Sequence, residues 1–180
     1  MKKILLSIIA ILTFAGCSNI MQQTPTSVVE DYLHKYQTLD EDLLDQLAAV
    51  LDMDNLNDTN KEAYQDVMKR QYQDLDYEIK DEKIDGDEAT VEVEIEVYNY
   101  QSVSNDADKY LEEHKEEFYG TDKKVDMDKY MEYKVGKLND AKDKVTYTIY
   151  FTLSKDEEGK WKLNDLSEKE RLKLHGLYEE

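Results

Sequence analysis

The sequence predicts an α+β fold, in which N-terminal helices pack on an antiparallel sheet. Apolar residues recur at helical spacing between Val28 and Tyr72, and from Leu75 onward they alternate with polar residues. A second helical stretch then lies between two hairpin patterns. An antiparallel sheet with one packed face needs helices to cover that face, and the first helices are available for this role.

Three helices are predicted before the sheet. The first begins at Pro25, because proline is favoured at the first helical position and Ser27 with Glu30 resembles a capping box. The second begins near Asp40 and carries leucines along one face. The third is opened by another capping box at residues 59–62.

The first hairpin has the clearest strand pattern in the chain. Asp85-Gly86 is a strong turn signal. Apolar residues at odd positions from Val91 to Val97 then alternate strictly with glutamates. We therefore expect one packed face and one acidic, hydrated face.

A helical insertion over residues 104–140 is predicted between the two hairpins. Its two helices span residues 105–119 and 126–138. Alternation resumes over residues 145–153, and a short strand and a final capped helix follow over residues 160–176.

The first seventeen residues resemble a bacterial lipoprotein signal. Lys2 and Lys3 form a positive n-region, and Ile4–Ala15 is an apolar run too short to span a bilayer, which needs roughly 20 residues. Small residues then precede Cys17, the only cysteine in the chain. Phe14 stands where leucine is commonest in a lipobox.

This resemblance implies that residues 1–16 are removed by cleavage between Gly16 and Cys17, and that a diacylglycerol is attached to the Cys17 thiol. Residues 17–24 would form a short tether and residues 25–180 a single domain, on the extracytoplasmic face of the bacterial membrane. More than one acyl chain gives stable anchoring. Without a second cysteine, the domain depends on its packed core for stability.

The formal net charge of −19 excludes some partners. An acidic surface is repelled by phosphate backbones and by anionic headgroups, so we expect no nucleic acid, and lipid must hold the protein at the membrane. The six glycines form no phosphate-binding loop, and no nucleophile elbow is present. The sequence therefore predicts no cofactor and no catalysis, and leaves open a basic protein partner or a small ligand.

Three segments carry a resemblance to a known superfamily: Thr24–Leu33, the turn Ile84–Asp87 with its following valine strand, and Gly159–Leu163. Together they resemble the nuclear-transport-factor-2-like proteins, and among these the small uncharacterised lipoproteins of low-GC Gram-positive bacteria. The resemblance implies a cone in which a curved sheet wraps a helix, often with a pocket at the wide end. Residues 104–140 are longer than the usual connection between the hairpins of that superfamily.

Two functions follow from the resemblance. The first is a non-catalytic binding or accessory module at the cell envelope. The second is a small-ligand carrier or an enzyme with a pocket inside the cone, since enzymatic members line that pocket with acid–base residues. Fold alone does not decide between them.

The three histidines, His34, His114 and His175, lie in separate predicted helices without metal-ligand spacing, so no zinc site is predicted. His34 and Asp31 are one helical turn apart and could form an acid–base pair. Because His34 lies beside the apolar face of its helix rather than on it, we favour a structural role and assign no catalytic residue.

A loop rich in carboxylates and amides could hold calcium. Its oxygen-bearing residues are Asp52, Asp54, Asn55, Asn57 and Asp58. An EF-hand loop needs oxygen ligands at positions 1, 3 and 5 and glycine at position 6, and here Leu56 stands at position 5. The sequence favours a helix-capping loop, and no metal site is predicted.

Two surfaces could bind larger partners. Tyrosines predicted on strands could form an aromatic strip for a sugar or peptide, or could pack against one another; they are Tyr98, Tyr100, Tyr147 and Tyr150. Acidic residues of the insertion could form a docking surface for a basic partner, or a solvated face; they are Asp106, Asp108, Glu112, Glu113, Glu116 and Glu117.

Overall fold

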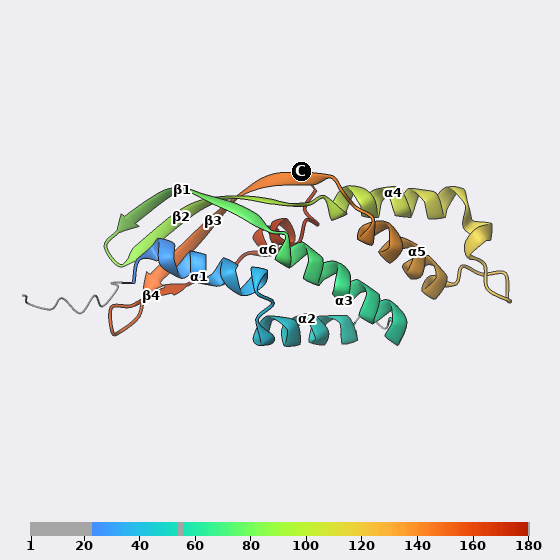
Figure 1. Ribbon diagram of the computed structural model, residues 1–180, viewed down its shortest axis with the longest axis horizontal. Helices are drawn as coiled ribbons and strands as arrows, with labels where there is room; N and C mark the ends of the chain where they lie inside the picture. Colours follow the sequence, from blue (N-terminus) through green and yellow to red (C-terminus); the bar gives the residue numbers. More distant parts are fainter. Residues whose placement is uncertain (1–22, 54–55, 180) are drawn as a thin grey trace, which may run out of the picture.

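The α+β prediction is confirmed, because the described residues form one antiparallel sheet with helices packed on one face (Figure 1). The structure is a computed structural model that describes residues 23–53 and 56–179. The predicted signal segment with Gly16 and Cys17, and most of the tether 17–24, lie outside these residues. No helix in the described part of the chain is long and apolar enough to cross a bilayer.

The elements follow in an order that places helices first, then one hairpin, then more helices and a second hairpin. Their bounds are α1 (Pro25–Gln37), α2 (Glu41–Met53), α3 (Asp58–Gln73), β1 (Asp76–Asp85), β2 (Glu88–Tyr98), α4 (Tyr100–Glu113), the 3₁₀ turn η1 (Lys115–Phe118), α5 (Met127–Asn139), β3 (Lys144–Lys155), β4 (Trp161–Leu163) and α6 (Glu168–Leu174).

The sheet is a meander with strand order β1-β2-β3-β4, and neighbouring strands are antiparallel. Val91 lies opposite Phe151 and Val93 opposite Ile149, so apolar side chains of both strands share one face. All four of these side chains are fully buried. The predicted alternation of a packed and an acidic face is therefore confirmed in β2.

Helix α1 lies across the packed face of the sheet. Val29 and Leu33 have no exposed area, and the Tyr32 ring meets the Phe151 ring edge-on at a centroid distance of 5.9 Å. Side chains of α1 thus pack directly on the buried face of the sheet.

Two predicted capping boxes begin at the wrong residue. In α1 the box pairs Thr24 with Ser27: the Ser27 N–H donates to Thr24 Oγ1 at 3.1 Å, and the Thr24 N–H donates to Ser27 Oγ at 3.0 Å. Since Pro25 occupies the first helical position, the cap must be the residue before it. Helix α3 is capped by Asn57 instead of Thr59.

The insertion begins earlier than the predicted residue 104. Asn99 caps α4, because its side-chain oxygen accepts from the Ser102 N–H at 3.0 Å. Tyr100 is therefore the first helical residue, and its prediction as a strand residue is wrong. Its ring is buried, and its hydroxyl donates to the Val67 carbonyl at 3.1 Å.

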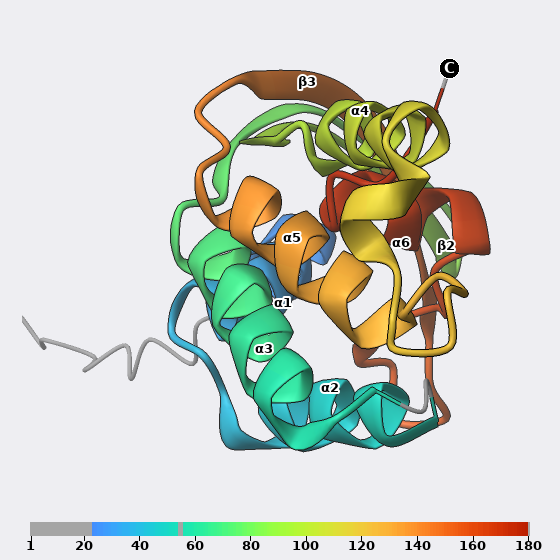
Figure 2. The ribbon, with the colours of Figure 1, turned by 90° about the vertical axis from the view of Figure 1, so that its right-hand side faces the viewer.

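Helices α4 and α5 lie side by side as an arm that extends from the sheet, and α5 packs beside α3 (Figures 1 and 2). The arm has a small core of its own, formed by Ala107, Phe118 and Tyr130. Tyr110 and Tyr133 stack beside that core at a centroid distance of 4.9 Å.

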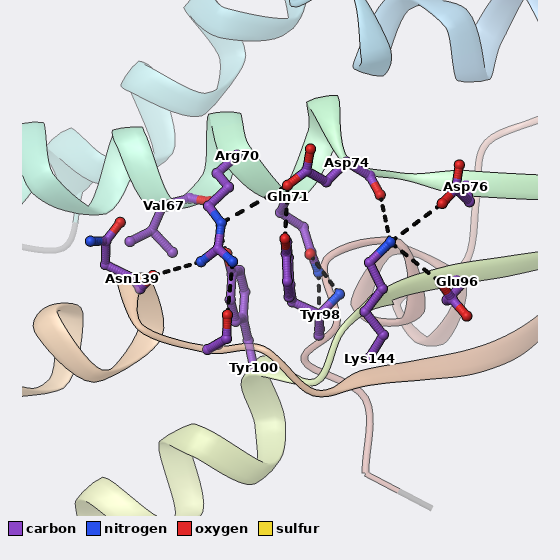
Figure 3. A network of polar contacts seen from close by, with 11 residues as sticks. Val67, Arg70, Gln71, Asp74, Asp76, Glu96, Tyr98, Tyr100, Asn139 and Lys144 are labelled. Atoms are coloured by element: carbon purple, nitrogen blue, oxygen red, sulfur yellow. Dashed lines mark hydrogen bonds and ion pairs between the residues drawn. The ribbon is translucent and has the colours of Figure 1, made fainter.

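Two neighbouring residues of α3 tie this arm to the sheet (Figure 3). The Arg70 guanidinium donates to the Asn139 carbonyl at 2.6 Å and to the Ala141 carbonyl at 2.7 Å, and lies 3.9 Å from the centre of the Tyr98 ring. The fully buried Gln71 accepts from the Tyr98 N–H at 2.9 Å and donates to the Tyr98 carbonyl at 3.2 Å. Both backbone polar groups of Tyr98, and the carbonyls of Asn139 and Ala141, thus find partners on α3.

Candidate ligand-binding cavity

An apolar cavity of about 300 Å³ lies among the helices below the sheet. Among the residues that the structure describes, no strand residue lines it. Its lining comes from the end of α1, from α2, α3 and α6, and from two residues that follow α6: Tyr36, Leu43, Gln46, Leu47, Leu51, Tyr64, Met68, Tyr72, Arg171, His175 and Leu177. The cavity is therefore separate from the concave face of the sheet.

Local sequence periodicity accounts for two of its walls. Leu43, Leu47 and Leu51 recur every four residues, so they share one face of α2. Tyr64, Met68 and Tyr72 share a face of α3 in the same way. Leu43, Leu47 and Tyr64 are only half-buried, because α2 and α3 do not close completely over the space between them.

Hydroxyl groups and one imidazole supply the polar part of the lining. The Tyr72 hydroxyl lies 3.3 Å from His175 Nε2, and the Tyr36 hydroxyl lies 2.9 Å from the Tyr32 hydroxyl. Burial raises the pKa of Tyr36 and the pKa of Tyr72. Burial, and secondarily the Arg171 charge, lower the pKa of His175 to about 4. At neutral pH the tyrosines are therefore protonated and His175 is neutral.

Arg171, an exposed residue of α6, supplies the positive charge of the cavity lining. Its Nη1 donates to the Leu166 carbonyl at 2.7 Å. Among the described residues it forms no ion pair, and none of the lining residues is a carboxylate. In a chain with 42 acidic residues, this is a local exception to the acidic surface.

The structure does not place the predicted acid–base pair in the cavity. Asp31 and His34 are both exposed on α1, whereas the lining residue of that helix is Tyr36. His114 ends α4, where its ring meets Tyr110 at 4.2 Å. Of the three histidines, His175 is the one that lines the cavity, and its partner is a tyrosine rather than a carboxylate.

The predicted tyrosine strip is not continuous. Tyr147 is buried on the packed face of β3, while Tyr150 on the same strand is 51% exposed on the other face. Tyr98 is half-buried beside Arg70, and Tyr100 lies in a helix. Tyr147 and Tyr150 are three positions apart, and side chains an odd number of positions apart lie on opposite faces of a strand. The alternation that identifies β3 therefore places the two tyrosines on different faces of the sheet.

The polar loop serves partly as a cap. Asn57 accepts from the Asn60 N–H at 2.8 Å and so begins α3, which Asp58 then enters as its first residue. The side chains of Asp52, Asp54 and Asn55 lie outside the described residues. In the described ranges, no three His, Cys, Asp or Glu side chains are grouped closely enough to hold a metal ion.

Some of the acidic residues of the insertion are used inside the arm. Asp108 accepts from the Tyr130 hydroxyl and pairs with Lys134 at 3.0 Å, and Glu117 accepts from the Tyr110 hydroxyl at 2.9 Å. The others, Asp106, Glu112, Glu113 and Glu116, are exposed. Part of the predicted docking surface therefore holds the helical hairpin together.

Comparison with known proteins gives a distant structural likeness. No protein-family model and no curated protein matches the chain. A solved structure that it resembles is that of "a putative lipoprotein (ycdA)" from Bacillus subtilis, with 12% sequence identity and a TM-score of 0.44. The match covers 88% of this chain and 48% of that protein, so this chain spans about half its length.

Proposed function

We propose that the protein is a lipid-anchored lipoprotein on the extracytoplasmic face of a bacterial membrane, and that its domain is a non-catalytic module that binds a small apolar ligand. The signal pattern ending at Cys17 supports the anchor. The helix-lined cavity supports the binding role, because ligand sites are mostly apolar hollows with a few placed polar groups. A helix lying across an antiparallel sheet supports the nuclear-transport-factor-2-like resemblance, which stays a prediction.

Replacing Cys17 with alanine is expected to abolish lipid attachment, because the thiol is the acceptor of the diacylglycerol. In cells supplied with radiolabelled palmitate, the protein should be labelled and should sediment with membranes, whereas Cys17→Ala should be unlabelled. Ser18→Ala is the matched control and should be labelled like the parent protein. Label that persists in Cys17→Ala would contradict the anchor.

Octanol is expected to bind in the cavity, because its chain removes apolar surface of the lining leucines from water. In methyl-resolved NMR spectra, octanol should shift the signals of Leu43, Leu47 and Met68. Leu47→Trp fills the cavity and should weaken binding by about tenfold or more, equivalent to about 1.4 kcal/mol.

Ile84→Trp is the matched control for this experiment, because Ile84 lies on β1 and is 54% exposed. It should bind octanol like the parent protein. Thermal melts followed by circular dichroism check that the variants fold. If Leu47→Trp does not fold, Leu43→Phe is used in its place. Octanol-dependent shifts confined to residues outside the cavity, or no shifts at all, would show that the cavity is not a binding site.

A further inference from the structure

We propose that the cavity takes a single-chain alkyl carboxylate, with the chain among the leucines of α2 and the carboxylate on Arg171. This inference rests on the proposed binding function and names the chemical class of its ligand. Four features of the described residues carry this inference. Most of the cavity wall is apolar, and its described lining contains no carboxylate. Among these residues the Arg171 guanidinium has no carboxylate partner, and the Tyr36 and Tyr72 hydroxyls are protonated.

The lining of the cavity favours an alkyl chain. Leucines of α2 face Met68 and two tyrosine rings of α3, so most of the wall is apolar. A wholly apolar ligand would leave Arg171 and the Tyr72 hydroxyl without a role in recognition. A ligand with one polar end satisfies both parts of the lining, since a few placed polar groups fix the orientation of a ligand in an apolar site.

The two arginines of this chain differ in what they contact. Arg70 donates to two carbonyls, lies over a tyrosine ring and has Asp74 at 3.9 Å. Its guanidinium is therefore already engaged by partners within the protein. Arg171 donates to one carbonyl and has no carboxylate partner in the part of the chain that the structure describes. A guanidinium carries five N–H donors in a planar fork that matches a carboxylate, and most of the donors of Arg171 are available.

The charge balance favours a carboxylate over a phosphate. Arg171 provides one positive charge, and His175 is neutral at neutral pH. The lining can therefore neutralise one negative charge on a ligand. A phosphate monoester carries close to two negative charges and would leave one uncompensated on a protein of net charge −19. The Tyr36 and Tyr72 hydroxyls, which pair with Tyr32 and His175, are protonated and so add no negative charge to the wall.

The test compares octanoate with octanol, which have the same chain and differ in charge. At pH 7.5, with octanoate below its critical micelle concentration, NMR titration of the protein should give a Kd for octanoate about tenfold lower than for octanol. Arg171→Gln should remove this preference, because it should weaken the binding of octanoate much more than the binding of octanol. Octylammonium should bind more weakly than octanol.

Lys169→Gln is the matched control, because it removes the same charge from the same helix, where the Lys169 Nζ lies 5.1 Å from the Tyr178 ring outside the cavity lining. It should retain the preference for octanoate. Equal binding of octanoate and octanol, or a preference that survives Arg171→Gln, would overturn this inference while leaving the proposed function in place. If neither probe binds, the proposed function itself is wrong.

Discussion

Gly176→Ala is expected to lower the free energy of unfolding by about 4 kcal/mol. This is the largest loss of stability that we expect from the addition of one methyl group. Gly176 has a φ of +68°, a conformation that L-residues with a side chain adopt only at a cost. A Cβ at this position would also overlap the Tyr98 carbonyl and the Gln71 side chain. Because one of these neighbours is backbone, the chain would have to move rather than rotate a side chain.

Gly159→Ala separates the two causes. Gly159 has a φ of +76°, but a Cβ there would meet nothing within 4 Å. It should therefore lose only the conformational contribution, about 1–2 kcal/mol. Urea unfolding of both variants measures the difference in free energy of unfolding. Equal losses would mean that the close approach of Gly176 to Tyr98 contributes nothing to stability.

The consequence of Gly176→Ala would extend beyond the turn in which it lies. The Gly176 carbonyl accepts from the Gln101 N–H at 2.8 Å, so the C-terminal turn also contacts the first turn of α4. Gln71 meets both backbone groups of Tyr98 at the same place. Segments from α3, β2, α4 and the C-terminal turn thus meet where the arm leaves the sheet, and a shift of Tyr98 would disturb each of them.

Local patterns in the sequence predict the elements better than their junctions. The alternation from Val91 to Val97 identifies β2 because the two-residue period is a property of the strand itself. The sequence places the start of α4 too late, because the short polar stretch after Tyr98 lacks helical periodicity, and the signal is a single capping residue, Asn99. In the same way, the predicted helix-capping loop does contain the cap of α3, but the cap is Asn57 rather than Thr59.

The cavity could not be predicted from the same patterns. Tyr64, Met68 and Tyr72 are recognisable as one face of a helix, but the sequence does not say that α6 completes the opposite wall about 100 residues later. His175 lies at the predicted end of the last helix, where the pattern indicates only a helix stop. Its meeting with Tyr72 is a tertiary contact, so neither residue carries a local signal for the site.

The partly buried position of His175 in the cavity wall leads to a second large effect, a loss of stability in acid. The pKa of His175 is lowered from 6.5 to about 4 in the folded protein, so between these pH values the unfolded chain binds the proton more readily. Stability therefore falls as the pH drops below 6.5 and the loss is complete near pH 4. The whole loss is about 3 kcal/mol, from about 1.4 kcal/mol for each unit of pKa.

His175→Gln isolates this contribution from the carboxylates that also titrate in acid. At pH 7 the variant should be somewhat less stable than the parent protein, because it disturbs the contact with Tyr72. As the pH falls to 4, the stability of the variant relative to the parent should rise by about 3 kcal/mol, since glutamine takes up no proton. Urea unfolding at half-unit pH intervals measures this difference.

His34→Gln is the matched control, because it makes the same substitution at a histidine that is exposed on α1. The gain in relative stability between pH 7 and pH 4 should be much smaller for His34→Gln than for His175→Gln. If His175→Gln behaves in the same way, then water reaches His175 freely, and the cavity that it lines is too wet to hold an alkyl chain. A steep difference for His175 alone would support a dry, helix-enclosed site beside Arg171.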